Sequence, residues 1–135
     1  MPLSKLILLY LLTTPVFFLI DMTWLIGVAR GFYKRELGAL LRTDVVWWAA
    51  ILFYLLFIVG ILYYAVLPAH EAGSWTRALM LGALFGFFTY MTYDLTNYST
   101  IKDWSLPLVF VDTLWGTVLS ASVATVSFFI AKFIS

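Results

Sequence analysis

The chain has 135 residues, of which 64% are hydrophobic and only 11% are charged, and its formal net charge is +1. A soluble domain carries roughly 25% charged residues, so this composition indicates an integral membrane protein. It also excludes several kinds of site. Without cysteine the chain forms no disulfide or thiolate-bound metal site. A single histidine excludes a two-histidine haem or metal site within the chain. A near-neutral charge provides no basic stripe for nucleic acid, so we expect no nucleic-acid partner.

Four stretches of the sequence are long and apolar enough to cross a membrane. A spanning helix needs about 20 mainly apolar residues, and cutting the chain at its charged residues leaves stretches over residues 6–29, 45–67, 78–98 and 106–134. The connecting loops are short, and no small-residue cleavage site follows the first stretch. The sequence therefore predicts an all-α membrane protein, a four-helix transmembrane bundle that forms one polytopic domain over residues 1–135.

The basic residues are distributed unevenly between the two sides of this bundle. The loops after the first and third spans hold five of the eight Lys and Arg residues, and the other side holds three. Cytoplasmic loops carry an excess of Lys and Arg, so we expect both termini on the opposite side, outside the cell.

The first loop contains the pattern of a short helix in the lipid headgroup region. Apolar residues such as Tyr33 and Leu37 recur at helical spacing, opposite charged ones, which is typical of an interfacial helix. Arg30, Lys34 and Arg35 are candidates for contact with headgroups, since each basic residue near an anionic surface contributes about 1 kcal/mol. The alternative is a simple topological anchor. Membrane lipids are the expected partners.

Three aspartates lie within the predicted spans, where carboxylates are costly. Asp21, Asp94 and Asp112 belong to the first, third and fourth spans, and an Asp at the centre of a spanning helix costs about 2.5–3.5 kcal/mol. Counting residues places all three in the half of the bilayer nearest the first loop, where the spans carry no Lys, Arg or His. We therefore expect them to face protein, and to be protonated, hydrated, metal-bound or paired with a cationic ligand. The alternative is that they only join helices through hydrogen bonds.

Other residues on the same helices are candidates to complete this site. Trp24, Asn97 and Trp115 each follow an Asp by three residues, a spacing that places both side chains on one helical face. The full set of candidate proton-, cation- or substrate-binding residues is Asp21, Asp94, Asp112, Asn97, Tyr93, Thr23, Thr96, Trp24 and Trp115. No catalytic residue is assigned. No cofactor is expected, apart from Mg²⁺ as an alternative, because only oxygen ligands are present.

Small residues follow one face of each of the last two spans. Gly82 and Gly86 are four residues apart in the third, and Gly116, Ser120 and Ala124 repeat at the same spacing in the fourth. Stripes of small residues let another helix backbone approach closely. We interpret them as packing surfaces that are candidates to form a homodimer.

A longer pattern covers nearly the whole chain. It consists of Asp21-Met-Thr-Trp-Leu, Gly31-Phe-Tyr-Lys-Arg-Glu-Leu-Gly38 and Thr92-Tyr-Asp-Leu-Thr-Asn-Tyr, followed by Trp104, Pro107, Asp112 and Trp115. This pattern resembles a bacterial integral-membrane family known as domain of unknown function 2177. The resemblance implies a four-helix protein of the bacterial inner membrane, so the outer side expected for both termini is the periplasm. It implies no activity.

Three functions from different classes are consistent with these residues. The first is a small transporter that uses the Asp cluster to couple protons or a cation to a small or lipophilic substrate, as intramembrane carboxylates do in proton relays. The second is an intramembrane enzyme that modifies a lipid or isoprenoid, with the Asp residues as acid and base or as Mg²⁺ ligands. The third is an accessory subunit of a larger membrane complex.

Overall fold

The computed structural model describes all 135 residues, which form helices joined by short connections, without strands. Two of the helices pass through π-helical turns, in which backbone hydrogen bonds skip one residue more than in an α-helix. The elements are α1 (Leu3–Met22) with the π-helical turn Thr23–Val28, α2 (Arg30–Leu37), the short 3₁₀ turn Gly38–Leu40, α3 (Trp47–Ile61) with the π-helical turn Leu62–Val66, α4 (Leu67–Ala72), α5 (Trp75–Thr100) and α6 (Leu106–Ile134). The predicted all-α fold is confirmed.

Four continuous helical segments are long and apolar enough to cross a membrane: Leu3–Val28, Trp47–Ala72, Trp75–Thr100 and Leu106–Ile134. The prediction of four spans is confirmed, but the predicted loop over residues 68–77 is wrong. The second span continues to Ala72 because the π-helical turn shifts the hydrogen-bond register, which leaves Pro68 in the first turn of α4, where proline is tolerated. Only Gly73 and Ser74 separate it from α5. Gly73 ends α4 with a φ of 66°, and the Ser74 hydroxyl caps α5 by accepting from the Arg77 amide.

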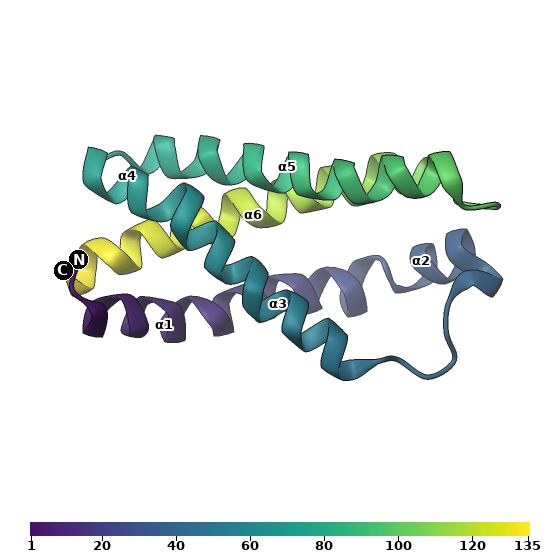
Figure 1. Ribbon diagram of the computed structural model, residues 1–135, viewed down its shortest axis with the longest axis horizontal. Coiled ribbons are helices and arrows are strands. Elements are labelled where there is room, and N and C mark those ends of the chain that lie inside the picture. Colours follow the sequence, from purple (N-terminus) through teal and green to yellow (C-terminus); the bar gives the residue numbers. More distant parts are fainter.

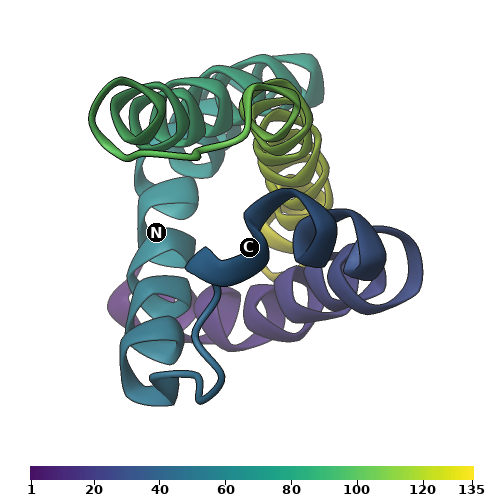
Figure 2. The same ribbon diagram turned by 90° about the vertical axis from the view of Figure 1, so that its right-hand side faces the viewer.

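The four spans meet tightly at one end and separate at the other. Figure 1 shows both termini together at one end of the bundle, where the Lys5 ammonium donates to the Ile134 carbonyl at 2.7 Å. Figure 2 looks at the opposite end, where α1, α3, α5 and α6 form four sides and α2 lies across the front. An even number of spans thus brings both termini to the same side, and α2 covers the more open end.

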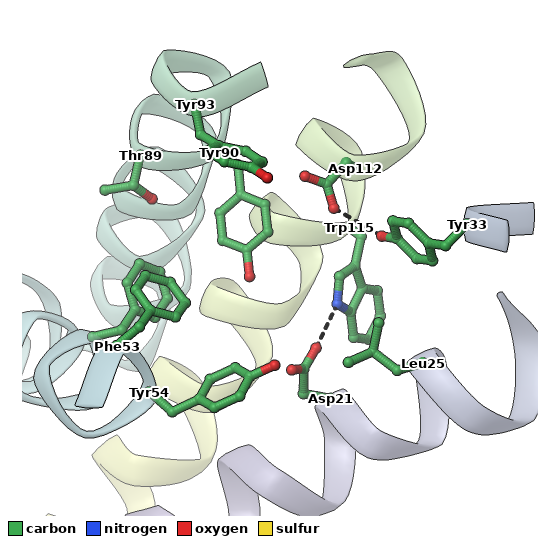
Figure 3. Close-up of a pocket in the computed structure, with 11 residues that line it drawn as sticks. Asp21, Leu25, Tyr33, Phe53, Tyr54, Thr89, Tyr90, Tyr93, Asp112 and Trp115 are labelled. Atoms are coloured by element: carbon green, nitrogen blue, oxygen red, sulfur yellow. Dashed lines mark hydrogen bonds between the residues drawn. The ribbon is translucent and has the colours of Figure 1, made fainter. Parts of the chain in front are cut away.

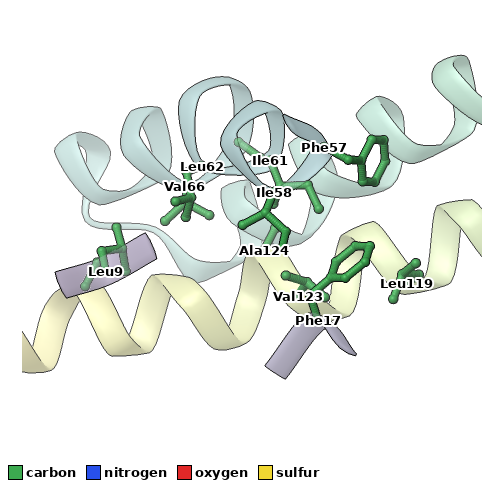
Figure 4. Close-up of a cluster of buried hydrophobic side chains, with 12 residues drawn as sticks. Leu9, Phe17, Phe57, Ile58, Ile61, Leu62, Val66, Leu119, Val123 and Ala124 are labelled. Atoms are coloured by element: carbon green, nitrogen blue, oxygen red, sulfur yellow. The ribbon is translucent and has the colours of Figure 1, made fainter. Parts of the chain in front are cut away.

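A buried apolar cluster fills the half of the bundle near the termini (Figure 4). Its members come from α1, the second span and α6, and include Leu9, Phe17, Ile58, Ile61, Val66, Leu119, Val123 and Ala124. Within this half the buried Thr13 and Ser127 hydroxyls are hydrogen bonded to each other at 2.7 Å, which joins α1 to α6. This end of the bundle is therefore closely packed.

The small-residue stripes pack α5 against α6 within the same chain. A Cβ atom added at Gly82 would lie 2.6 Å from the Ala124 Cβ, and one at Gly86 would overlap the Gly116 carbonyl and the Ser120 side chain. The five small residues, interpreted from the sequence as candidates for a homodimer surface, thus lie at a contact between two helices of one chain. A homodimer stays a prediction.

The close contact between α5 and α6 predicts that a single added methyl group lowers the stability of the protein. Gly86→Ala forces the two helices apart, and such overpacking costs about 1–3 kcal/mol. We expect a lower thermal unfolding midpoint for the purified variant in detergent. Gly31→Ala is the control, because nothing lies within 4 Å of a Cβ at Gly31. A Gly86→Ala variant as stable as the Gly31→Ala variant would contradict close packing of this contact.

Candidate functional site

A cavity of about 480 Å³ lies between the spans in the half of the bundle covered by α2 (Figure 3). Most of its wall is aromatic, contributed by Tyr33, Phe53, Tyr54, Phe57, Tyr90, Tyr93 and Trp115, with Leu25. Its remaining lining residues are Asp21, Thr89 and Asp112. The cavity thus combines a mainly apolar wall with two carboxyl groups, and no Lys, Arg or His is among the lining residues.

The two carboxyl groups lie at one depth on antiparallel helices. Asp21 is seven residues before Val28, the last residue of the first span, and Asp112 is six residues after Leu106, where the fourth span begins. At 1.5 Å per helical residue, each is roughly 10 Å from the end of its span. The Asp21 side chain is only 3% exposed. Both side chains face the cavity, from the α1 wall and the α6 wall (Figure 3).

A crossed network of hydrogen bonds holds these carboxyl groups. Trp115 Nε1 donates to Asp21 Oδ1 at 2.9 Å, and the Tyr33 hydroxyl donates to Asp112 Oδ1 at 2.8 Å. Trp24 Nε1 in turn donates to the Tyr33 oxygen at 3.1 Å, and the Trp24 and Trp115 rings stack with centroids 4.6 Å apart. Each Asp is therefore positioned by a donor from a different element of the chain.

The spacing of the sequence produces this crossing. Asp21 and Trp24 are three residues apart on the first span, as are Asp112 and Trp115 on α6, so each pair shares one helical face. Because the two helices are antiparallel, the Trp of one motif can reach the Asp of the other. The Trp24 carbonyl accepts a hydrogen bond from the Ala29 amide at 2.8 Å, and this bond closes the last turn of the first span. This wide last turn leads the chain directly into α2.

Tyr33 has a role in the site that its spacing in the sequence does not predict. The spacing places it on the apolar face of an interfacial helix, but its hydroxyl turns inward to Asp112. Burial, and then the neighbouring Asp112 carboxylate, raise the pKa of the Tyr33 phenol above its ordinary value, so the phenol keeps its proton and acts as a donor. Glu36 provides a second link, because its carboxylate accepts from the Ser105 hydroxyl at 2.7 Å. These two contacts fix α2 over the cavity.

Asp94 lies behind the cavity wall and not in it. Its side chain is fully buried on α5 and neighbours Asp112 and Thr113, yet neither of its oxygens has a hydrogen-bond partner, and the Thr113 hydroxyl is also unpartnered. Unsatisfied buried polar atoms are rare in proteins and call for an explanation. Asp21 and Asp112 thus share the cavity, and Asp94 neighbours Asp112 without being part of the cavity lining.

Three of the predicted polar residues do not line the cavity. Thr23 and Thr96 are exposed and donate to carbonyls of their own helices, those of Leu19 and Thr92. Asn97 is half-buried on α5 and is absent from the cavity lining. Hydroxyl groups on a spanning helix satisfy themselves on the preceding turn when no partner faces them. Their expected role around the carboxylates is therefore not seen in this arrangement.

The basic residues of the first loop lie on the outer side of α2. Arg30, Lys34 and Arg35 are exposed, and the Arg35 guanidinium lies 5.9 Å from the centre of the Phe32 ring. None of the three lines the cavity. They are free to contact lipid headgroups, as expected for an interfacial helix, and they do not neutralise Asp21 or Asp112.

The carboxyl groups do not enclose a metal ion with protein ligands alone. No group of three His, Cys, Asp or Glu side chains is arranged to hold one. Asp21 and Asp112 each use one oxygen to accept from a neutral donor, and Asp94 is not part of the cavity lining. The arrangement is that of two separate carboxyl groups facing one apolar space.

Comparison with known proteins identifies the family. The family described as "Predicted membrane protein (DUF2177)" matches residues 6–129. The chain belongs to this family. The resemblance noted in the sequence is thus confirmed, and the membrane character of the DUF2177 family agrees with the four spans. No curated protein and no solved structure matches the chain, so its function has to be argued from the cavity itself.

The hydrogen bonds of the Tyr33 hydroxyl predict that α2 opens more readily when this hydroxyl is removed. Tyr33→Phe eliminates the bonds to both Asp112 and Trp24. A hydrogen bond to a charged group contributes about 1.5–3 kcal/mol, which corresponds to about tenfold or more in the opening equilibrium. We expect amide hydrogen exchange in α2 to accelerate by about that factor. Tyr63→Phe on the exposed side of the second span is the control. Unchanged exchange in α2 would contradict the inward position of Tyr33.

Proposed function

We propose that this member of the DUF2177 family is a proton-coupled carrier, which binds a small, mainly apolar substrate in the cavity between its spans. The observation that carries this proposal is the pair Asp21 and Asp112, two carboxyl groups facing one cavity inside the membrane-spanning part of the chain. Intramembrane carboxylates typically belong to substrate pathways and proton relays. Their bound donors are an indole N–H and a phenol, which orient them without supplying a compensating charge.

The surroundings of the pair support coupling between substrate and proton. Charges are costly in an apolar environment. We propose that a substrate that occupies the cavity exchanges with a proton on the carboxyl pair. Asp94 neighbours Asp112 outside the cavity lining, which makes it a candidate donor and acceptor of that proton.

The difference in packing between the two halves of the bundle supports a carrier whose cavity opens to one side of the membrane at a time. The cavity occupies the α2 half, whereas the apolar cluster and the Thr13–Ser127 bond close the half near the termini. The first and second spans contain π-helical turns, Thr23–Val28 beside the cavity and Leu62–Val66 within the apolar cluster, and such turns are frequent at functional sites. We propose that they are the points at which the first and second spans change shape.

We further propose that the cavity half faces the cytoplasm in a bacterial inner membrane, with both termini periplasmic. Five of the eight Lys and Arg residues belong to the α2 end of the bundle. They are Arg30, Lys34, Arg35, Arg42 and Lys102. The positive-inside rule then assigns this end to the cytoplasm.

A lipid- or isoprenoid-modifying enzyme is the second candidate. Its support is the contact of both carboxyl groups with an aromatic wall, because aromatic faces stabilise cations and two carboxyl groups in different environments can divide acid and base roles. An accessory subunit is the third candidate, and a protein partner that co-purifies at constant stoichiometry would favour it.

The carrier proposal is tested by proton movement in proteoliposomes that contain a pH-sensitive dye. Concentration gradients of lipophilic compounds, which include cationic, neutral and anionic molecules, are imposed one at a time across the liposome membrane. We expect at least one compound to drive proton flux with the unmodified protein, and flux to fall to the level of empty liposomes in Asp21→Asn and Asp112→Asn. Asp103→Asn is the matched control, since Asp103 is exposed in a connection and Asn tolerates its φ of 62°.

Two outcomes would contradict the proposal. Flux that persists in both cavity variants would show that the carboxyl pair does not carry the proton. Chemical conversion of a compound by the unmodified protein, without proton flux, would favour the enzyme.

A further inference from the structure

We infer that the substrate is a monovalent lipophilic organic cation, held between the Asp21 and Asp112 carboxyl groups by the aromatic walls of the cavity. This inference rests on the proposed function and names the substrate class of the same site. Its basis is a cavity with two acidic groups, a nearly complete aromatic lining and no basic residue.

The charge of the site selects the sign of the ligand. Only one oxygen of each carboxyl group accepts a hydrogen bond, from Trp115 and from Tyr33, and the Tyr54 phenol points toward Asp21 (Figure 3). Both carboxyl groups line the cavity and are therefore open to a ligand. An anionic ligand would add a like charge there. A cationic ligand instead offsets carboxylate charge, which is costly to leave uncompensated in an apolar cavity.

The aromatic walls select an organic cation over a metal ion. Cations bind over the faces of Trp, Tyr and Phe within about 6 Å of the ring centre, and aromatic cages recognise quaternary ammonium groups in this way. Tyr54 and Tyr90 reach toward the middle of the cavity from α3 and α5, and Trp115 faces it from α6 (Figure 3). A metal ion would need several oxygen ligands, and the site has no group of three such side chains.

The volume of the cavity fits a cation with bulky apolar groups. Small-molecule sites typically enclose about 300–1,000 Å³, and this one encloses about 480 Å³. The apolar substituents would contact Leu25, Phe53 and Phe57, which line the same space. A small hydrated cation would leave these side chains without contacts.

The test compares two probes of nearly identical shape and opposite charge, tetraphenylphosphonium and tetraphenylborate. Their binding to the purified full-length protein in detergent is measured by calorimetry, with protein-free micelles as the blank. We expect tetraphenylphosphonium to bind and tetraphenylborate not to bind above the blank. This comparison uses the unmodified protein, so it does not depend on whether a variant folds.

Variants then assign the binding to the cavity. We expect Asp21→Asn and Asp112→Asn each to weaken tetraphenylphosphonium binding by about tenfold, with Asp103→Asn unchanged. Tyr93, which lines the cavity and is half-exposed, gives a matched aromatic pair. Tyr93→Leu should bind about two- to fivefold more weakly than Tyr93→Phe, because only phenylalanine keeps an aromatic ring there.

The outcomes separate this inference from the carrier proposal. Equal binding of both probes, no binding of tetraphenylphosphonium, or binding unaffected by both Asp variants would overturn the inference. The carrier proposal would still stand if a neutral compound drove Asp-dependent proton flux. Binding of tetraphenylphosphonium that depends on both Asp residues, without proton flux in liposomes, would support the cation site and reject the carrier.

Discussion

Two carboxyl groups without a cationic partner inside a membrane bundle constrain most of this structure. Backbone amides of spanning helices are used within the helices, so Asp21 and Asp112 take their hydrogen-bond donors from side chains of other elements. Trp115 supplies one donor and Tyr33 the other. The position of α2 follows from this requirement, because Tyr33 reaches Asp112 only when α2 folds back across the open end of the bundle.

The same constraint divides the molecule into a closely packed half and an open half. Near the termini, apolar side chains and the Thr13–Ser127 bond fill the space between the spans. Along α5 and α6, glycines allow a backbone contact that any larger residue would prevent. This rigid seam holds Asp94 and Asp112 next to each other, while the first and second spans diverge to leave the cavity. The cavity is thus bounded by α5 and α6 on one side and by the first and second spans on the other.

The spans and the common depth of the carboxyl groups could be predicted from the sequence, because both depend on counting apolar residues from the nearest charge. The end of the second span could not be predicted. Proline usually interrupts a helix, and the π-helical turn that precedes Pro68 has no sequence signature. The aromatic lining from α3 was also missed. That span is apolar on all sides, so periodicity does not distinguish Phe53, Tyr54 and Phe57 from residues that face lipid.

Two other differences have a similar cause. A stripe of small residues predicts that a helix is approached closely, but it does not identify the helix that approaches, and here it is α6 of the same chain. The spacing of Tyr33 predicts an apolar face of a short helix, but whether that face meets lipid or protein depends on the direction in which the chain leaves the first span.

The central claim is that water and solutes reach a cavity within the membrane-spanning part of this chain. It is tested most directly by thiol labelling in native membranes, because the chain has no cysteine of its own. Thr89 lines the cavity, whereas Phe87, two residues before it and therefore on the opposite side of α5, is exposed and absent from the cavity lining. A water-soluble methanethiosulfonate should modify Thr89→Cys and leave Phe87→Cys, shielded by lipid, unmodified. Protection of Thr89→Cys to the same extent as Phe87→Cys would contradict the account.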